Sequence, residues 1–230
     1  MAELQGVPVY RVRRSTGPLV VDGRLDEAAW QMAEAVELVD TITGEPPRQK
    51  TTVRLLYDNM RLYVGFHALD RDIWGTLTGH DDPIYDEEVV EIFLDSCGLL
   101  TTYLEFEVSP LNTGFDALIV NDAVVSGTQG RGERFQGFTA YDPQGFRHAV
   151  HIQGKVNAGE GGAEFWECEM AIAFADLYLG GRVPPAAGDR WRFNLYRIDG
   201  RAPALEETAF SPTGVSDFHA PSRFGWLEFC

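Results

Sequence analysis

Basic residues are scarce in this chain of 230 residues. Lysine and arginine together number 19, against 35 aspartates and glutamates, which gives a formal net charge of −16. Lys50 and Lys155 are the only lysines. A protein that binds nucleic acid or an anionic membrane surface needs a basic face that displaces counterions. The charge therefore argues against both of these partners.

Cysteines and long apolar runs are scarce as well. Cys97, Cys168 and Cys230 show neither the CxxC spacing nor the spacing of zinc ligands, so we expect no disulfide framework and no structural metal of that kind. No apolar run approaches the ~20 residues of a membrane-spanning helix. The first six residues lack the basic start and apolar stretch of a secretory leader. The sequence as it stands predicts a cytoplasmic protein, or an extracellular one if a leader has been removed.

Strand-like alternation, broken by clusters of Gly, Pro, Asn and Asp, dominates the chain. One short helix is predicted over Asp26–Ala33. The acidic residues in its first turn would interact favourably with the positive end of the helix dipole. The length and the element order predict one all-β domain over residues 1–230, an antiparallel β-sandwich of immunoglobulin-like or jelly-roll-like type with one short N-terminal helix. The predicted strands are Thr52–Tyr57, Leu62–Leu69, Val89–Asp95, Tyr103–Ser109, Phe115–Val120, Phe146–Val156, Phe165–Phe174, Arg190–Asp199 and Gly225–Phe229.

Several predicted strands have one apolar face and one polar face. In Tyr103–Ser109, for example, Glu105 and Glu107 lie on the face opposite to that of Phe106. The second faces of four such strands carry carboxylates, an arginine, an asparagine and aromatic residues. This surface is either a solvated face with cross-strand ion pairs or a binding surface, and the alternation alone favours neither.

A series of motifs resembles the family 9 carbohydrate-binding modules and their relatives. VVDGRLDEAAW at residues 20–30 is similar to their DGxLDExxW opening. LYVGF (62–66), VVEIFLD (89–95), YLEFEVSPLN (103–112) and WECEMAIAF (166–174) follow in order. The resemblance implies a single antiparallel sandwich whose best-known activity is sugar binding. It also implies a glycoside hydrolase as a partner in trans, because such modules normally accompany a catalytic domain.

The same resemblance implies that two aromatic side chains grip a terminal sugar. We expect these to be Trp74, in a loop after a predicted strand, and Phe210. The C–H faces of a pyranose pack on flat aromatic rings, while its hydroxyl groups need paired donors and acceptors. Glu105 has an alternative role in pairing with Arg192 or Arg197. The candidate hydrogen-bonding residues are Glu105, Asn112, Tyr196, His80, Asp82 and His219.

The densest charge cluster is the acidic loop at residues 81–88. Calcium takes six to eight oxygen ligands, and related modules often carry structural calcium. Asp81 and Asp86 are therefore the candidate ligands of a calcium cofactor. The alternative is a solvated acidic surface.

The predicted function is non-catalytic binding of a carbohydrate, either a polysaccharide or the end of an oligosaccharide. One alternative is a glycoside hydrolase, which would use two of the carboxylates Glu91, Glu105, Glu107, Glu167 and Glu169. Another is a sandwich that binds haem or a further cofactor, for which His67 and Met170 are the candidate axial ligands.

Overall fold

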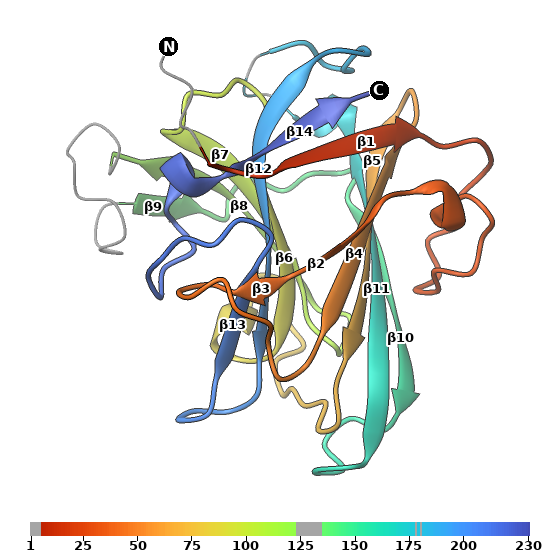
Figure 1. Ribbon diagram of the computed structural model, residues 1–230, viewed down its shortest axis with the longest axis vertical. Helices are drawn as coiled ribbons and strands as arrows, with labels where there is room; N and C mark the ends of the chain where they lie inside the picture. Colours follow the sequence, from red (N-terminus) through yellow and green to blue (C-terminus); the bar gives the residue numbers. More distant parts are fainter. Residues whose placement is uncertain (1–5, 123–134, 178, 180) are drawn as a thin grey trace.

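Two β-sheets form the structure, which a computed structural model describes over residues 6–122, 135–177, 179 and 181–230. They stand side by side in Figure 1. Sheet A has the strand order β9 (Phe135–Phe138), β8 (Gly114–Asn121), β7 (Thr102–Val108), β6 (Val89–Asp95), β12 (Arg190–Asp199) and β14 (Gly225–Phe229), and β13 (Glu206–Ala209) links β12 to β3 (Val39–Asp40). Sheet B has the order β10 (Arg147–Gly154), β11 (Ala163–Ala173), β5 (Arg61–Leu69) and β4 (Thr51–Tyr57), and β2 (Ala35–Glu37) pairs with β4.

The strand β1 (Val9–Arg14) joins the two sheets across the top of Figure 1. Its residues 9–12 pair with β14 of sheet A, and its residues 13 and 14 pair with β4 of sheet B. Both pairings are parallel, whereas the other strand pairs are antiparallel. The predicted antiparallel β-sandwich is thus confirmed, with β1 as the exception. No helix within the described ranges is long and apolar enough to cross a membrane.

The main hydrophobic core lies between the sheets. Phe106 of β7 and Phe193 of β12 belong to the same buried cluster as Phe66 of β5 and Trp166 of β11. Successive side chains of a strand point to opposite faces, so these residues define the inner face of each sheet. The predicted division of each strand into two faces agrees with this cluster.

Each sheet also buries apolar residues on its outer face. A second cluster includes Phe93, Tyr103 and Phe115, whose side chains alternate with the core residues of sheet A. A third cluster packs Trp30 against Tyr63 on the outer face of sheet B. The third cluster covers part of the outer face of sheet B, and the second forms the base of the candidate site described below.

The predicted helix over Asp26–Ala33 is wrong, because the structure has there only the three-residue 3-10 helix η1 (Trp30–Met32). The backbone N–H groups of Trp30 and Met32 donate to carbonyl groups three residues earlier, at Glu27 and Ala29. Hydrogen bonds between residues three apart are typical of a 3-10 helix. In this short helix the side chain of Trp30 is only 1% exposed, because it packs on sheet B. Tertiary packing therefore outweighs the local preference of the acidic residues for a helix.

Glu169 of β11 ties this N-terminal segment to sheet B. Its Oε2 accepts hydrogen bonds from the backbone N–H groups of Asp22 and Gly23, both at 2.9 Å. Its Oε1 accepts a hydrogen bond from Nε1 of Trp30 at 3.1 Å. The two motifs at residues 20–30 and 166–174 thus form one contact, centred on a carboxylate that is 1% exposed.

We predict that Glu169→Ala lowers the free energy of unfolding by about 2–3 kcal/mol, because it leaves three donors without their acceptor. Chemical denaturation measures this change. Glu164→Ala is the matched control, since Glu164 lies on the same strand but is exposed. Equal stability of the two variants would contradict the prediction.

Candidate functional site

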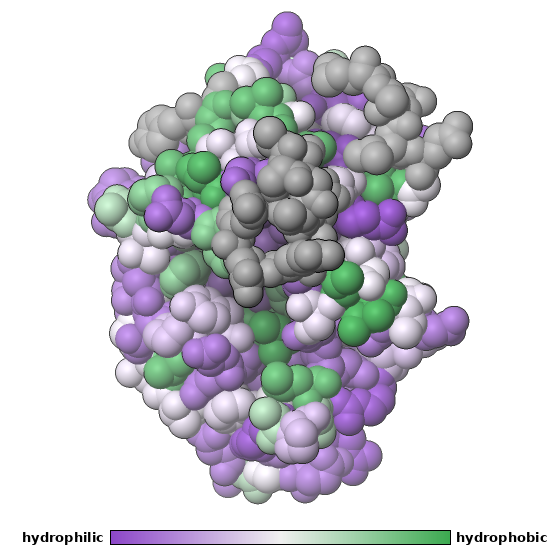
Figure 2. All heavy atoms as spheres, turned by 90° about the vertical axis from the view of Figure 1, so that its left-hand side faces the viewer, coloured by the Kyte–Doolittle hydropathy of each residue, from purple (hydrophilic) through white to green (hydrophobic). Residues whose placement is uncertain are grey.

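A pocket of about 600 Å³ opens on the outer face of sheet A. Its base is formed by Glu91 and Phe93 of β6, Glu105 of β7 and Phe115 of β8, and the 3-10 helix η2 (Ile84–Asp86) supplies Tyr85 at its edge. Figure 2 shows the molecule from this side, where apolar side chains gather among hydrophilic ones near the centre of the face. The pocket therefore combines an apolar surface with carboxylates on a strand-built base.

Aromatic rings line much of the pocket. Phe218 stacks on Tyr196, with ring centroids 4.1 Å apart and an interplanar angle of 5°. Tyr85 meets Phe115 edge-on with centroids 5.5 Å apart, and its side chain is 45% exposed. Because Tyr85 and Phe218 both line the pocket and are held by other rings, they can present flat apolar surfaces to a ligand.

Glu91 and Glu105 at the base of the pocket form a cluster with Glu107, which is buried and does not line the pocket itself. Glu91 and Glu107 are directly opposite each other on β6 and β7, and Glu105 lies two residues before Glu107 on the same face. One oxygen of each carboxyl group lies within 4.8 Å of the others. Burial raises the pKa of Glu105 to about 7 and raises the pKa values of Glu91 and Glu107 well above their ordinary range. These groups therefore hold protons at pH values where exposed carboxyl groups are ionised.

His219 reaches the pocket as a neutral imidazole. Burial lowers its pKa to about 3. Nδ2 of Asn121 donates to Oη of Tyr103, and this hydroxyl lies 2.8 Å from Nδ1 of His219. When the hydroxyl donates to Nδ1, the proton of the neutral ring is on Nε2, which is 4.0 Å from Oε1 of Glu105. His219 and Glu105 are thus the two predicted hydrogen-bonding residues that line this pocket.

The proposed pairing of Glu105 with an arginine is wrong. Arg197 lies on the inner side of β12, where it donates to Asp70 at 2.8 Å and to Asp199 at 3.0 Å. Arg192 donates to the carbonyl of Ser222 at 3.0 Å. Both guanidinium groups are therefore engaged away from Glu105.

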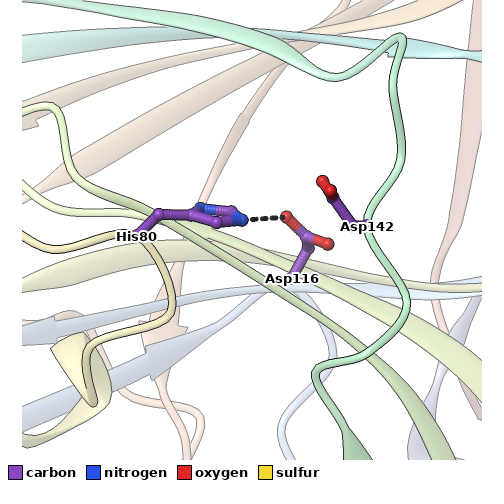
Figure 3. Close-up of side chains that lie close together, drawn as sticks. All are labelled: His80, Asp116 and Asp142. Atoms are coloured by element: carbon purple, nitrogen blue, oxygen red, sulfur yellow. Dashed lines mark ion pairs between the residues drawn. The ribbon is translucent and has the colours of Figure 1, made fainter.

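His80, another predicted hydrogen-bonding residue, lies in a separate polar cluster shown in Figure 3. Its Nε2 is 3.7 Å from Oδ2 of Asp116 and 3.6 Å from Oδ1 of Asp81, while Asp142 approaches from the facing loop. Burial raises the pKa of Asp116 to about 7, and the charge of His80 opposes this rise. His80, Asp116 and Asp142 could together hold a cation, because one atom of each lies within 4.8 Å of the others.

The structure does not assemble the predicted calcium ligands into one site. Among the described residues, neither Asp81 nor Asp86 belongs to a group of three side chains with ligand atoms within 4.8 Å of one another. Oδ1 of Asp81 faces His80 and the backbone N–H of Asp116, and Asp86 is exposed in η2. Sequence proximity in an acidic loop is insufficient here, because Asp81 turns toward His80 and Asp116 while the side chain of Asp86 is exposed.

Trp74 and Phe210 have different surroundings, and neither lines the pocket. Nε1 of Trp74 donates to the carbonyl of Gly200 at 3.0 Å, and the guanidinium of Arg201 lies 4.6 Å from the ring. Phe210 packs on the main core, with its ring centroid 5.1 Å from that of Phe193. Their role as a sugar-gripping pair stays a prediction.

The remaining three predicted residues make local contacts. Asn112 has a φ of 60°, typical of a turn, and its Oδ1 lies 2.9 Å from Nδ1 of His148. Oδ2 of Asp82 accepts a hydrogen bond from the backbone N–H of Gly79 at 2.6 Å. Tyr196 is fully buried, and its hydroxyl donates to the carbonyl of Phe218. Tyr196 therefore supports an aromatic residue of the pocket from behind.

Tyr85 and Phe218 were missed by the sequence analysis. Tyr85 is the one aromatic residue within the acidic segment 81–88, and Phe218 is the first residue of the segment FHAPSRFG that precedes β14. In a fully solvated acidic loop an aromatic side chain would have no apolar surface to contact. The presence of a tyrosine in this segment is therefore the signal that could have identified Tyr85.

The pH dependence of stability tests the burial of these carboxyl groups. The pKa values of Glu105 and Asp116 are raised to about 7, from ordinary values near 4, so the folded protein binds these protons more tightly than the unfolded chain. Their contribution to stability is complete below about pH 4 and is lost as the pH rises through about 7. We predict a shallower decline of the unfolding free energy between pH 5 and pH 8 for Asp116→Asn than for the wild type.

Denaturation at the two pH values measures this difference, and Glu164→Gln serves as the exposed control. An unchanged slope in Asp116→Asn would show that this carboxyl group does not take up a proton on folding.

A family model described as "Carbohydrate family 9 binding domain-like" matches residues 21–229. A protein of Arthroderma benhamiae described as "Extracellular protein" is 30% identical over 196 residues, which cover 82% of each chain.

Solved structures with 16% sequence identity share the fold. A crystal structure from Bacteroides uniformis superposes with a TM-score of 0.73, covering 98% of this chain and 100% of the other. A carbohydrate binding module of family 9 from Caldicellulosiruptor kristjanssonii superposes with TM-scores of 0.63 in complex with glucose and 0.61 in complex with cellotriose. These matches cover 96% of this chain and 95% and 93% of the others.

Proposed function

This chain belongs to the carbohydrate family 9 binding domain-like proteins, and we propose that it binds carbohydrate, without cleaving it, in the pocket of sheet A. The observation that carries the proposal is the pocket itself. Its volume of about 600 Å³ and its aromatic walls around buried polar groups are typical of a preformed ligand site. The complexes of the Caldicellulosiruptor kristjanssonii module with glucose and cellotriose support a saccharide as the ligand.

The pocket offers the two kinds of contact that a pyranose needs. The exposed ring of Tyr85 and the stacked ring of Phe218 supply apolar surfaces for the C–H faces of the sugar. Glu105 and the neutral imidazole of His219 supply hydrogen-bonding groups for its hydroxyl groups. Because Tyr196 and Phe115 hold the two aromatic rings, little side-chain entropy is lost on binding.

The protonation of the glutamates favours binding over hydrolysis. A retaining glycosidase needs one ionised carboxylate as nucleophile beside a protonated acid. Burial raises the pKa of Glu105 to about 7 and those of Glu91 and Glu107 well above their ordinary range, so below pH 7 these three carboxyl groups are mainly protonated and supply no ionised nucleophile. An assay for reducing ends released from cellulose or xylan tests this point, and steady release that Glu105→Gln abolishes would overturn it.

We predict that Tyr85→Ala and Phe218→Ala each weaken cellotriose binding by about 1–2 kcal/mol, because each removes apolar surface that the sugar would cover. This corresponds to a loss of about 5-fold to 30-fold in affinity, measurable by isothermal titration calorimetry. Trp74→Ala is the matched aromatic control and should leave the affinity unchanged, since Trp74 lies outside the pocket. Loss of binding in Trp74→Ala alone would instead support the pair of Trp74 and Phe210.

A further inference from the structure

The glutamate cluster at the base of the pocket has more buried carboxyl groups than a neutral sugar requires. Glu91, Glu105 and Glu107 are 1%, 5% and 0% exposed. Oε1 of Glu91, which lines the pocket, is buried without a hydrogen-bond partner. Burying ionisable groups without partners is costly, and three carboxylates this close repel one another unless protons or a cation neutralise them.

The described residues supply no cation for this cluster. His219 approaches Glu105 at 4.0 Å, but burial keeps its imidazole neutral by lowering its pKa to about 3. Among the described residues that line the pocket, none is a lysine or an arginine. Arg192 and Arg197, the basic residues of the adjacent strand β12, are bound to other partners. In the empty pocket, protons therefore neutralise the carboxyl groups, in agreement with their raised pKa values.

We propose that the pocket is selective for an amino sugar, whose ammonium group donates hydrogen bonds to Glu91 and Glu105 while its ring lies between Tyr85 and Phe218. This inference rests on the proposed carbohydrate-binding function and specifies the chemical class of the sugar. An ammonium group has three donors, and one oxygen each of Glu91 and Glu105, the two glutamates that line the pocket, lie within 4.8 Å of each other, so that one ammonium group can bridge them. As the ammonium binds, the carboxyl groups that contact it release their protons to solvent, so that opposite charges face each other in the complex.

The shape and walls of the pocket favour an organic ammonium over a bare metal ion. A single ion at the carboxyl groups would leave most of the 600 Å³ unfilled. Phe93, Phe115, Phe135 and Phe218 also line the pocket, and aromatic ring faces attract cations through their quadrupoles. Carboxylates together with aromatic faces are suited to a cation that carries an apolar ring.

Calorimetry at pH 6 tests the proposal with three ligands of similar length. These are the β-1,4-linked trimer of glucosamine, its N-acetylated counterpart and cellotriose. We expect the glucosamine trimer to bind about tenfold more tightly than either neutral trimer, which corresponds to one charge-assisted contact. Titration in two buffers of different ionisation enthalpy should show proton release with the glucosamine trimer and none with cellotriose.

The variant Glu91→Gln keeps the shape of the base but removes one charge. We expect it to abolish most of the preference for glucosamine over cellotriose, while Glu164→Gln, an exposed substitution on sheet B, leaves the preference intact. Equal binding of all three trimers would overturn the amino-sugar inference and leave the proposed function standing. Binding of none of them would overturn the proposed function.

A metal site is the competing outcome. Binding of Ca²⁺ or Tb³⁺ that Glu91→Gln abolishes, together with no preference for glucosamine, would overturn the amino-sugar inference in favour of a cation site. Because Tyr85 lines the same pocket, Tb³⁺ bound there would show luminescence sensitised by tyrosine.

Discussion

The structure depends on a sheet that is buried on both of its faces. The inner face of sheet A packs against sheet B, and its outer face carries Phe93, Tyr103 and Phe115 in a second buried cluster. Strand geometry sends alternate side chains to opposite faces, so the glutamates of β6 and β7 share the buried outer face with these rings. A pocket with an aromatic surface and a carboxyl base follows directly from this arrangement. The same burial explains why these carboxyl groups hold their protons near neutral pH.

The two arginines of β12 lie on opposite faces of sheet A, because successive side chains of a strand alternate between its faces. Arg197 lies on the inner side, where it bridges β12 to Asp70 near the end of β5. Arg192 lies on the outer side, with its guanidinium 4.7 Å from the ring of Trp226. Neither arginine forms an ion pair with the glutamates of the pocket, because Arg197 pairs with Asp70 and Asp199 and Arg192 contacts Ser222 and Trp226. Among the described residues, the carboxyl groups of the pocket therefore have no lysine or arginine partner, for two reasons. The chain has few basic residues, and the arginines of β12 contact other groups.

The strands and their two faces could be predicted from the sequence, because period-two alternation depends on neighbouring residues alone. Glu105 was identified as a site residue for this reason. The conformation of residues 26–33 could not be predicted from the local pattern of acidic and apolar residues. It depends on the packing of Trp30 against sheet B, which the local sequence does not encode. The short strands β2, β3, β9 and β13 were missed because each has four residues or fewer, and the six-residue strand β1 was missed as well.

The loops limited the prediction of the site. Tyr85 and Phe218 are 133 residues apart and meet the pocket from different segments, a placement that no local pattern encodes. The prediction of Trp74 rested on its position in a loop, but its ring stacks under the guanidinium of Arg201 and its Nε1 donates to the carbonyl of Gly200. The proposed binding site therefore lies on the outer face of sheet A, where the alternation had already predicted a polar and partly aromatic surface.

A crystal structure of the protein soaked with cellotriose tests the central claim most directly. The account predicts electron density for a sugar ring between Tyr85 and Phe218, with its hydroxyl groups within hydrogen-bond distance of Glu105. Density for the sugar on Trp74, with the pocket of sheet A filled by water alone, would contradict it.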